Sequence, residues 1–339
     1  MTVAVPPAPI RSVNTVKNTR GDSGPKGQHT VPESYLKAWG DPTAKNPLDP
    51  YVWSFPKDKI KGAPKPPAAI FKRADFYTIH LPDGSRDLRL EHGLASTEER
   101  FCAIRDEKLA NGRALSPEER VWVCAFVAAM KARTPGFMEF HREQYRPMLE
   151  YMRELEAWAA TATPEQRAAQ AGIWALRSDK RPSGTIEDVE RIVASPVEHL
   201  MPPMIAAQLP ILAEMNMTIL TTDDPVGFIT SDEPCVLFDP NAYKRPPIYR
   251  SPGLAFETIE VTLPASPTQL VLLSWRGPEG YREAPLAAVD NLNRLRRFHA
   301  HEYYVVNANV SRPIWFHPGV EPKDSWEKTE GPKWGAKNE

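Results

Sequence analysis

Cysteine is scarce in this sequence. Its 339 residues include three cysteines, Cys102, Cys124 and Cys235, and no two of them stand in a Cys-x-x-Cys spacing. An odd and widely spaced set argues against a disulfide framework and against a zinc ribbon. We therefore expect free thiols, a reducing compartment and a cytoplasmic location.

Long apolar runs and an excess of charge of one sign are also missing. No apolar stretch approaches the roughly 20 residues needed to cross a bilayer, and the N-terminal region lacks the continuous apolar segment of a secretory signal. The 42 basic residues nearly balance the 43 acidic ones. We therefore expect a soluble protein without membrane contact. Nucleic-acid binding is not favoured by charge but would be allowed by a local basic patch. The sequence indicates no other partner.

Several well-defined catalytic motifs are absent. The chain contains no GxxxxGK[ST], no GxGxxG, no HExxH and no GxSxG. These absences argue against a P-loop ATPase, a Rossmann dehydrogenase, a common zinc protease and an α/β hydrolase.

The composition is that of a chain able to bury a large core, since 41% of its residues are hydrophobic. Residues 1–27 and 319–339 are poor in periodic apolar positions, which predicts a disordered arm and a flexible tail. Between them, residues 28–318 are predicted to form one domain.

The order of patterns along the chain predicts the fold class. Helical periodicity dominates the middle, and short apolar strands dominate the C-terminal third. Helices are expected at about 32–39, 90–110, 117–133, 136–161, 164–177, 185–195 and 287–302. Strands are expected at about 51–58, 68–85, 217–222, 227–232, 235–238, 258–263, 269–274 and 303–308. This segregation predicts an α+β fold, with a helical central region packed against a mostly antiparallel sheet built largely from the C-terminal third.

The helix expected at 117–133 is apolar nearly all round, so we expect it to lie in the centre of the core. Trp122, Phe126 and Met130 recur at four-residue intervals on it and should be buried. Cys124 belongs to the same core, whereas Cys235 is expected to be more accessible.

A series of short blocks resembles the domain-of-unknown-function 4238 family. HTVPESYLKAW is similar to that family's HHxVPxxYLxxF start, AAMKARTP to a block ending in Arg-Thr-Pro, FITSDEPCVLF to its Thr-Ser-Asp-x-Pro block, and VDNLNRL to its Asn-x-Asn block. The resemblance spans about residues 28–308. It implies a shared fold and no established activity. Gln28 stands where the family often has a first histidine, which weakens any role that needs two imidazoles.

His29 and Glu33 form the first candidate site. They would share a face if the first helical turn included His29. An imidazole beside a carboxylate can bind a metal or transfer a proton. The alternative is a histidine that braces a helix start, with Glu33 placed favourably near the helix N-terminus.

Glu91 and Glu99, joined by Glu98, form the second candidate. Eight residues span a little over two helical turns, so Glu91 and Glu99 should point the same way and could offer oxygens to a hard cation. The competing interpretation is a solvated acidic face.

The third candidate is the block from Thr230 to Pro234. Asp232 follows an apolar strand, where a carboxylate can bind a metal or act as a general base, and Ser231 can donate a hydrogen bond to substrate. The competing interpretation is a turn in which these side chains bond to local backbone.

Three further residues and one basic cluster complete the candidates. Arg133, at the end of the apolar helix, can hold a phosphate or carboxylate or simply favour the helix C-terminus. Asn291 and Asn293 could contact substrate or cap the late helix. The basic cluster at 294–301 could touch phosphate, but a solvated helix face explains it as well.

These candidates lead to two functional hypotheses. The first is a hydrolase, with or without the help of a metal ion, acting on a phosphodiester or other polar substrate. In it His29, Glu33, Glu99, Arg133 and Asp232 carry the chemistry. A divalent metal, if one binds, would be held by His29, Glu99 and Asp232, and Ser231, Asn291 and Asn293 bind substrate. The second is a non-catalytic binding or sensing module, for example in phage defence. Convergence of His29, Glu99 and Asp232 in one cleft would favour the first.

Overall fold

The computed structural model describes residues 27–45, 50–175 and 184–317. Helices fill the central part of the chain, and most strands come from its C-terminal part, so the α+β prediction is confirmed. The predicted arm lies outside the described residues except for Gly27, which begins the first strand. The predicted tail at 319–339 lies outside them altogether.

The larger sheet has five strands in the order β12-β7-β11-β10-β9. They are β7 (Asn216–Thr221), β9 (Val236–Phe238), β10 (Glu260–Ser266), β11 (Gln269–Ser274) and β12 (Gly280–Glu283). Neighbours are antiparallel except for β12 and β7, which run parallel. The apolar runs predicted as strands therefore form the centre of this sheet.

A second sheet joins the two ends of the described chain. Its order is β3-β2-β13-β8, and all its pairs are antiparallel. The strands are β2 (Val52–Pro56), β3 (Ala63–Lys65), β8 (Thr230–Ser231) and β13 (Tyr303–Val306). Two small ribbons accompany it: β1 (Gly27–His29) with β4 (Lys72–Ala74), and β5 (Ile79–His80) with β6 (Arg86–Asp87).

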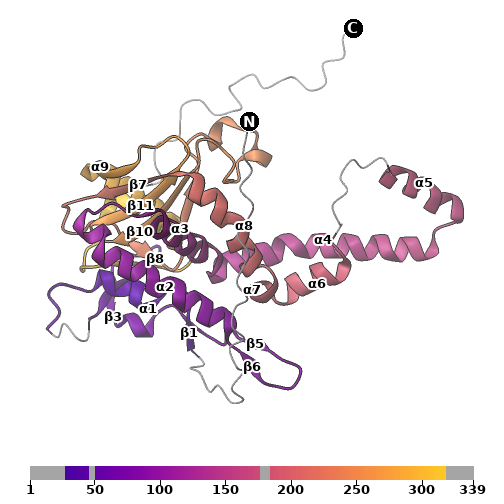
Figure 1. Ribbon diagram of the computed structural model, residues 1–339, viewed down its shortest axis with the longest axis horizontal. Coiled ribbons are helices and arrows are strands. Elements are labelled where there is room, and N and C mark those ends of the chain that lie inside the picture. The colour runs from indigo at the N-terminus through magenta and orange to yellow at the C-terminus, as the bar shows by residue number, and fades with distance from the viewer. Residues whose placement is uncertain (1–26, 46–49, 176–183, 318–339) are drawn as a thin grey trace, which may run out of the picture.

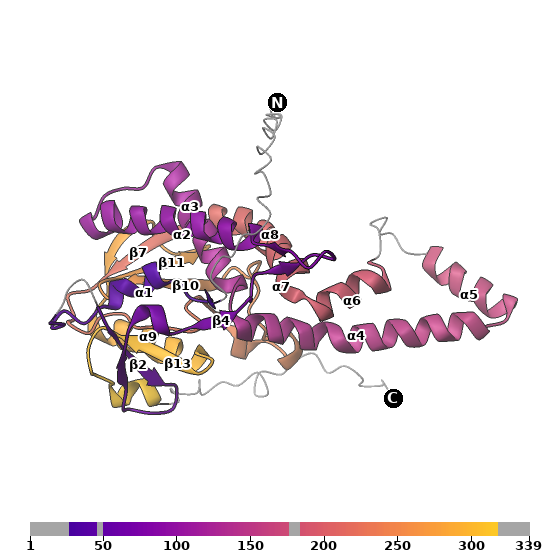
Figure 2. The same ribbon diagram turned by 90° about the horizontal axis from the view of Figure 1, so that it is seen from below.

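Three helices pack beside the larger sheet (Figures 1 and 2): α2 (Arg89–Glu107), α3 (Pro117–Ala132) and α8 (Met201–Glu214). A capping box at Ser116 and Glu119 starts α3, as the Ser-Pro-Glu-Glu sequence predicts. Phe126 and Met130 are fully buried, Trp122 is only half-buried, and Phe126 stacks on Phe101 with ring centroids 3.9 Å apart.

The remaining helices form a helical projection and one helix near the C-terminal end of the described chain. α4 (Pro135–Thr161), α5 (Pro164–Ala175) and α6 (Ile186–Ala194) extend away from the sheets in both views (Figures 1 and 2), and α7 (Pro196–His199) leads back to α8. α9 (Leu286–His299) precedes β13. The short 3-10 helices are η1 (Lys37–Trp39), η2 (Pro67–Ala69), η3 (Leu109–Asn111), η4 (Ala242–Lys244), η5 (Pro247–Tyr249) and η6 (Pro313–Phe316).

Some local predictions were wrong. His29 ends strand β1, and the first helix, α1, runs only from Glu33 to Leu36 with Pro32 before it, so His29 and Glu33 do not share a helical face. The stretch 68–85 is broken into short pieces, because Phe71 and Asp75 adopt positive φ angles of 55° and 51°.

Other differences concern elements that pattern alone did not resolve. α8 was not predicted because its prolines obscure the helical pattern, yet two of them occupy the first turn, where proline is tolerated. The strand at 227–232 reduces to the two residues of β8. Cys235 is buried rather than accessible, and Cys124 is buried as expected. None of the helices in the described part of the chain combines the length and hydropathy of a bilayer-spanning segment.

Candidate functional site

The start of α4 meets the turn between β8 and β9. The Thr134 hydroxyl, at the N-cap of α4, donates a hydrogen bond of 2.5 Å to Oε2 of Glu233 across 99 residues of sequence. Gly136 makes this approach possible, since a Cβ at that position would lie 2.6 Å from Oε1 of Glu233. The same point lies 3.4 Å from Nδ1 of His301, which places this imidazole on the same side of Gly136.

Glu233 is a largely buried carboxyl group. Burial raises its pKa to about 7, and the neighbouring Asp232 adds to the rise, while Thr134 and Lys131 oppose it. Its Oε1 is buried and makes no hydrogen bond to the described residues. A carboxyl with such a pKa exchanges its proton near neutral pH, as a general acid or base must.

A cavity of about 670 Å³, the larger cavity, opens beside Glu233. One wall is apolar and includes Phe137 and Phe140 of α4, Met204 of α8 and Leu237 of β9. The titratable groups around it are Lys57, Lys131, His141, Glu233, Cys235, His299 and His301. A cavity of this size with a few converging polar groups is suited to a small-molecule ligand.

The charges in the larger cavity are unevenly distributed. Burial and the proximity of Lys131 lower the pKa of His141. Desolvation, with Arg296 and Lys131 nearby, lowers the pKa of His299 to about 4. Both imidazoles are therefore neutral near pH 7 and able to accept hydrogen bonds. Lys57 and Lys131 are the lysines that line this cavity.

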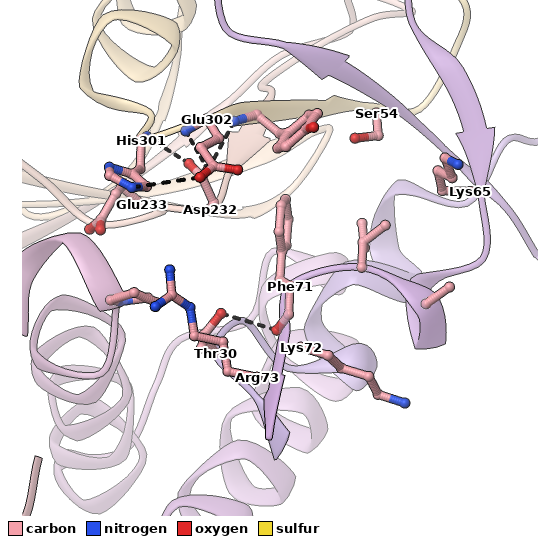
Figure 3. A pocket seen from close by; sticks show the side chains of 14 residues that line it. Thr30, Ser54, Lys65, Phe71, Lys72, Arg73, Asp232, Glu233, His301 and Glu302 are labelled. Atoms are coloured by element: carbon pink, nitrogen blue, oxygen red, sulfur yellow. Dashed lines mark hydrogen bonds and ion pairs between the residues drawn. The ribbon is translucent and has the colours of Figure 1, made fainter. Parts of the chain in front are cut away.

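A smaller cavity of about 370 Å³ also has Glu233 in its lining (Figure 3). Glu233 and His301 line both cavities. Figure 3 shows Asp232, Glu233, His301 and Glu302 on one side and the β4 residues Lys72 and Arg73 on the other. Glu233 is thus the carboxyl group that the linings of the two cavities share.

Asp232 itself is bonded to the backbone. Its Oδ1 accepts from the amide of His301 at 2.8 Å, and its Oδ2 accepts from the amides of Glu302 and Tyr303 at 2.6 and 2.9 Å. Burial raises the pKa of Asp232, and the three amides oppose that rise. The Ser231 hydroxyl accepts from the amide of Glu233 at 3.2 Å. These contacts match the turn interpretation of this block.

Arg133 is buried and paired within the chain. It forms an ion pair with Glu98 and donates to Oη of Tyr77 at 3.2 Å and to the carbonyl oxygen of His29 at 2.7 Å. Burial opposes its charge, but Tyr77 and Glu98 outweigh this effect and raise its pKa. The carboxylate it holds therefore belongs to this protein and not to a ligand.

The two residues of the first candidate pair have their principal contacts with other groups, although their charges still interact. Glu33 pairs with Lys37 at 2.8 Å on the surface of α1. Burial and the charge of Lys72 lower the pKa of His29, whose buried Nε2 makes no hydrogen bond to the described residues. On α2, Glu91 accepts from the Gln28 amide at 2.7 Å, and Glu99 is exposed.

The asparagines and arginines of α9 brace the fold. Asn293 is buried and bonds to the backbone at Gly227 and Ile229, whereas Asn291 is exposed and accepts from Arg294. Arg296 and Arg297 bond to carbonyl oxygens of Pro234, Thr262, Trp315 and Lys57. Arg296 and Arg297 of the basic cluster are therefore internal, whereas His299 and His301 at its end are exposed.

The metal set predicted from the sequence is not assembled. No group of three or more His, Cys, Asp or Glu side chains suited to a metal ion occurs among residues 27–45, 50–175 and 184–317. His29, Glu99 and Asp232 lie in this part of the chain, and of the three only Asp232 lines either of the two cavities.

A protein-family model described as "Protein of unknown function (DUF4238)" matches residues 27–309. The chain belongs to this family. No curated protein and no solved structure matches it.

Three of the DUF4238 blocks converge around the site. The Arg-Thr-Pro block contributes Arg133 and Thr134, the first block contributes the His29 carbonyl that Arg133 holds, and the Thr-Ser-Asp-x-Pro block contributes Asp232. Glu233 occupies the x of that block. The residues of these blocks therefore hold together the backbone around the site, and in this chain the carboxyl group at the variable position is that of Glu233.

Sequence reasoning missed the groups that surround the larger cavity. Glu233 adjoins Asp232, and the sequence does not show which of these two carboxyl groups bonds to the backbone. His299 and His301 stand out in the sequence only as part of a basic cluster. Lys131 and His141 carried no signal, because their approach to Glu233 depends on how α3 and α4 meet the end of α9.

Proposed function

We propose that this DUF4238 protein is a hydrolase of small polar esters that uses Glu233 as its general acid and base. The observation that carries the proposal is the Glu233 carboxyl: a pKa of about 7, one oxygen fixed by Thr134, and a position between two cavities. Groups with these properties are concentrated at functional sites.

The reaction would proceed by attack of water. Glu233 removes a proton from a water molecule as its oxygen attacks the phosphorus or carbonyl carbon of the ester. The bond to the leaving oxygen then breaks, and Glu233 returns the same proton to that oxygen. The same carboxyl group thus acts first as the general base and then as the general acid, which a pKa near the working pH permits.

Lys131 supports the charge that develops in this reaction. It lies at the end of α3, lines the larger cavity and interacts electrostatically with Glu233. A cation at this point stabilises negative charge on the ester oxygens. The aromatic wall formed by Phe137 and Phe140 would hold the apolar part of the substrate.

The bonding of Ser231, Asp232 and Arg133 favours a second candidate, a non-catalytic binding module. Each of these polar side chains is bonded within the protein, as expected for structural turns. In that case the larger cavity would bind a small molecule without transforming it.

The two candidates differ in turnover. We would assay wild-type protein on p-nitrophenyl acetate, p-nitrophenyl phosphate and bis(p-nitrophenyl) phosphate over a range of pH. The hydrolase proposal expects turnover with an inflection near pH 7, and Glu233→Gln should lower kcat by about 100-fold or more.

Glu99→Gln is the matched control, because Glu99 is an exposed glutamate outside both cavities. It should keep wild-type activity. Turnover that survives Glu233→Gln, or an equal loss of turnover in Glu99→Gln, would reject the assignment. Ligand binding without turnover would favour the binding module.

A further inference from the structure

Lys131 is the point of the larger cavity on which separate parts of the chain converge. It lies in the last turn of α3 and lines the cavity. Its charge favours the anionic forms of Glu233 and Cys235, which precede β9. It also disfavours the cationic forms of His141 on α4 and His299 on α9. One ammonium group therefore acts on side chains from three different parts of the fold.

The direct contacts of Lys131 leave its charge available. Its ammonium nitrogen lies 4.9 Å from the centroid of the Phe137 ring, which is a cation–π contact. It forms no ion pair with any residue in the part of the chain that the structure describes, and the Glu233 carboxyl bonds instead to Thr134. A lysine that lines a cavity in this way can pair with negative charge on a ligand.

An aromatic wall stands beside Lys131. The His141 ring contacts the Phe137 ring edge-on, with centroids 4.3 Å apart, and it contacts the Phe140 ring at 5.4 Å. Phe140 is nevertheless 56% exposed, although it lines the cavity. An apolar group from a ligand would remove part of this ring from water, and aromatic rings pack favourably against each other. The wall therefore fits a flat aromatic group.

The charges around Glu233 distinguish carboxylic esters from phosphate esters. A phosphate ester carries a permanent negative charge, which Glu233 would repel in the anionic form that accepts a proton from water. Among the described residues that line the larger cavity there is no arginine, a side chain that binds phosphate through two parallel hydrogen bonds. The ammonium nitrogen of Lys57 lies 5.7 Å from the centroid of the Phe298 ring. The lining is thus poorly suited to a phosphate group.

A carboxylic ester matches these charges. It is neutral until the water oxygen attacks its carbonyl carbon, and it then develops one negative charge on the carbonyl oxygen. A single ammonium group such as that of Lys131 can stabilise this charge. The same ammonium group can pair with the carboxylate of the acid that hydrolysis releases.

We infer that the substrate is a carboxylic ester with an aromatic acyl group, which the larger cavity holds against Phe137 and Phe140 with its carbonyl oxygen at Lys131. The inference rests on the proposed function and names its substrate class. In the reaction the acyl carbon gains the water oxygen and loses its bond to the alcohol oxygen, which receives a proton through Glu233. The acid product gives its remaining proton to solvent and leaves as an aromatic carboxylate.

Binding of the product acid tests the cavity without any turnover. In calorimetric titrations, benzoate should bind wild-type protein. Three analogues should each bind at least about tenfold more weakly: acetate, which lacks the ring, benzamide, which lacks the charge, and phenyl phosphate, which carries the phosphate group.

Two variants and their controls assign the contacts. Lys131→Met removes the charge and should weaken benzoate binding by about tenfold or more. Lys61→Met, at an exposed lysine outside both cavities, should bind benzoate like wild type. Phe140→Ala should weaken the binding of benzoate by about threefold or more and leave that of acetate unchanged. Its control is Tyr151→Ala, at a similarly exposed aromatic residue of α4 that lines neither cavity.

Glu233 should make benzoate binding depend on pH. The charged or titratable groups around it are Asp232 beside it, Lys131 on α3, His141 on α4, and His299 and His301 at and after the end of α9. Benzoate is fully ionised above about pH 6, whereas Glu233, with its pKa of about 7, gains negative charge as pH rises through neutrality. Benzoate should therefore bind about tenfold more weakly at about pH 8 than at about pH 6, and Glu233→Gln should remove this difference.

Four binding results would each overturn the inference: no benzoate binding by wild type, equal binding by Lys131→Met, a pH dependence that persists in Glu233→Gln, or phenyl phosphate bound as tightly as benzoate. Hydrolysis of p-nitrophenyl phosphate without hydrolysis of p-nitrophenyl benzoate would also overturn it and would leave the proposed function standing. Absence of all hydrolysis, with benzoate binding that depends on Lys131, would reject the proposed function and leave the cavity as a binding site for aromatic carboxylates.

Discussion

Replacement of Glu233 by glutamine should alter how stability depends on pH. Folding raises the pKa of Glu233 from 4.5 to about 7, because the carboxyl is desolvated. The folded state therefore binds the proton more tightly than the unfolded state. This contribution is fully present below the unfolded pKa and is lost as pH rises through the folded pKa.

The magnitude follows from that shift. Between about pH 5 and pH 8, the wild-type free energy of unfolding should fall by about 2.5 kcal/mol through Glu233 alone. Glutamine keeps an oxygen that can accept from Thr134 and cannot titrate, so the Glu233→Gln variant should lack this fall. The variant should therefore gain stability relative to wild type as pH rises.

Urea denaturation at both pH values measures the difference, and Glu302→Gln, an exposed neighbour, is the control. Constant relative stability of Glu233→Gln, or relative stability that falls with pH, would refute the reasoning. A fall would mean that Glu233 acts as a stable anion at the N-terminus of α4, with a depressed pKa and no acid–base role.

Three other predictions concern the frame. Phe126→Ala should lower the free energy of unfolding by about 3–5 kcal/mol, because Phe126 is fully buried against Phe101. The control Val121→Ala, on the exposed side of α3, should change this free energy by only about 0.5 kcal/mol. Equal effects of the two substitutions in urea denaturation would contradict the placement of α3. Asp232→Asn should cost about 1–3 kcal/mol, because one amide nitrogen would then face a backbone N–H that now donates to a carboxylate, and an unchanged melting temperature would count against this bonding. Deletion of residues 1–26 and 319–339 should leave the melting temperature nearly unchanged in a thermal scan, and a large drop would show that these residues pack on the fold.

Local patterns determined much of this molecule. The Ser-Pro-Glu-Glu sequence specifies the start of α3, and the apolar periodicity that follows specifies its burial. The short apolar runs at β10 and β11 specify neighbouring strands. These features can be predicted because caps, turns and periodicity depend on residues a few positions apart. The family blocks were recognisable for the same reason.

The candidate site depends on distances that the sequence does not encode locally. The block at 230–234 drew attention to Asp232, yet in the folded chain Asp232 turns toward the backbone amides before β13 and Glu233 turns toward Thr134 at the start of α4. Neighbouring side chains on an extended segment point to opposite sides, so one residue of register decides which carboxyl is bonded and which is available.

Tertiary packing also decided what each charged residue does. Arg133 and Asn293 are of residue types that often bind ligands. Both are buried, and their contacts with Glu98 and the Gly227 carbonyl hold parts of the fold together. The raised pKa of Glu233 arises from the desolvation that α4 and its surroundings impose. The sequence alone determined the residue types and the local elements, whereas only the tertiary structure decided which polar groups lost water, which gained partners, and which carboxyl group remained able to exchange a proton.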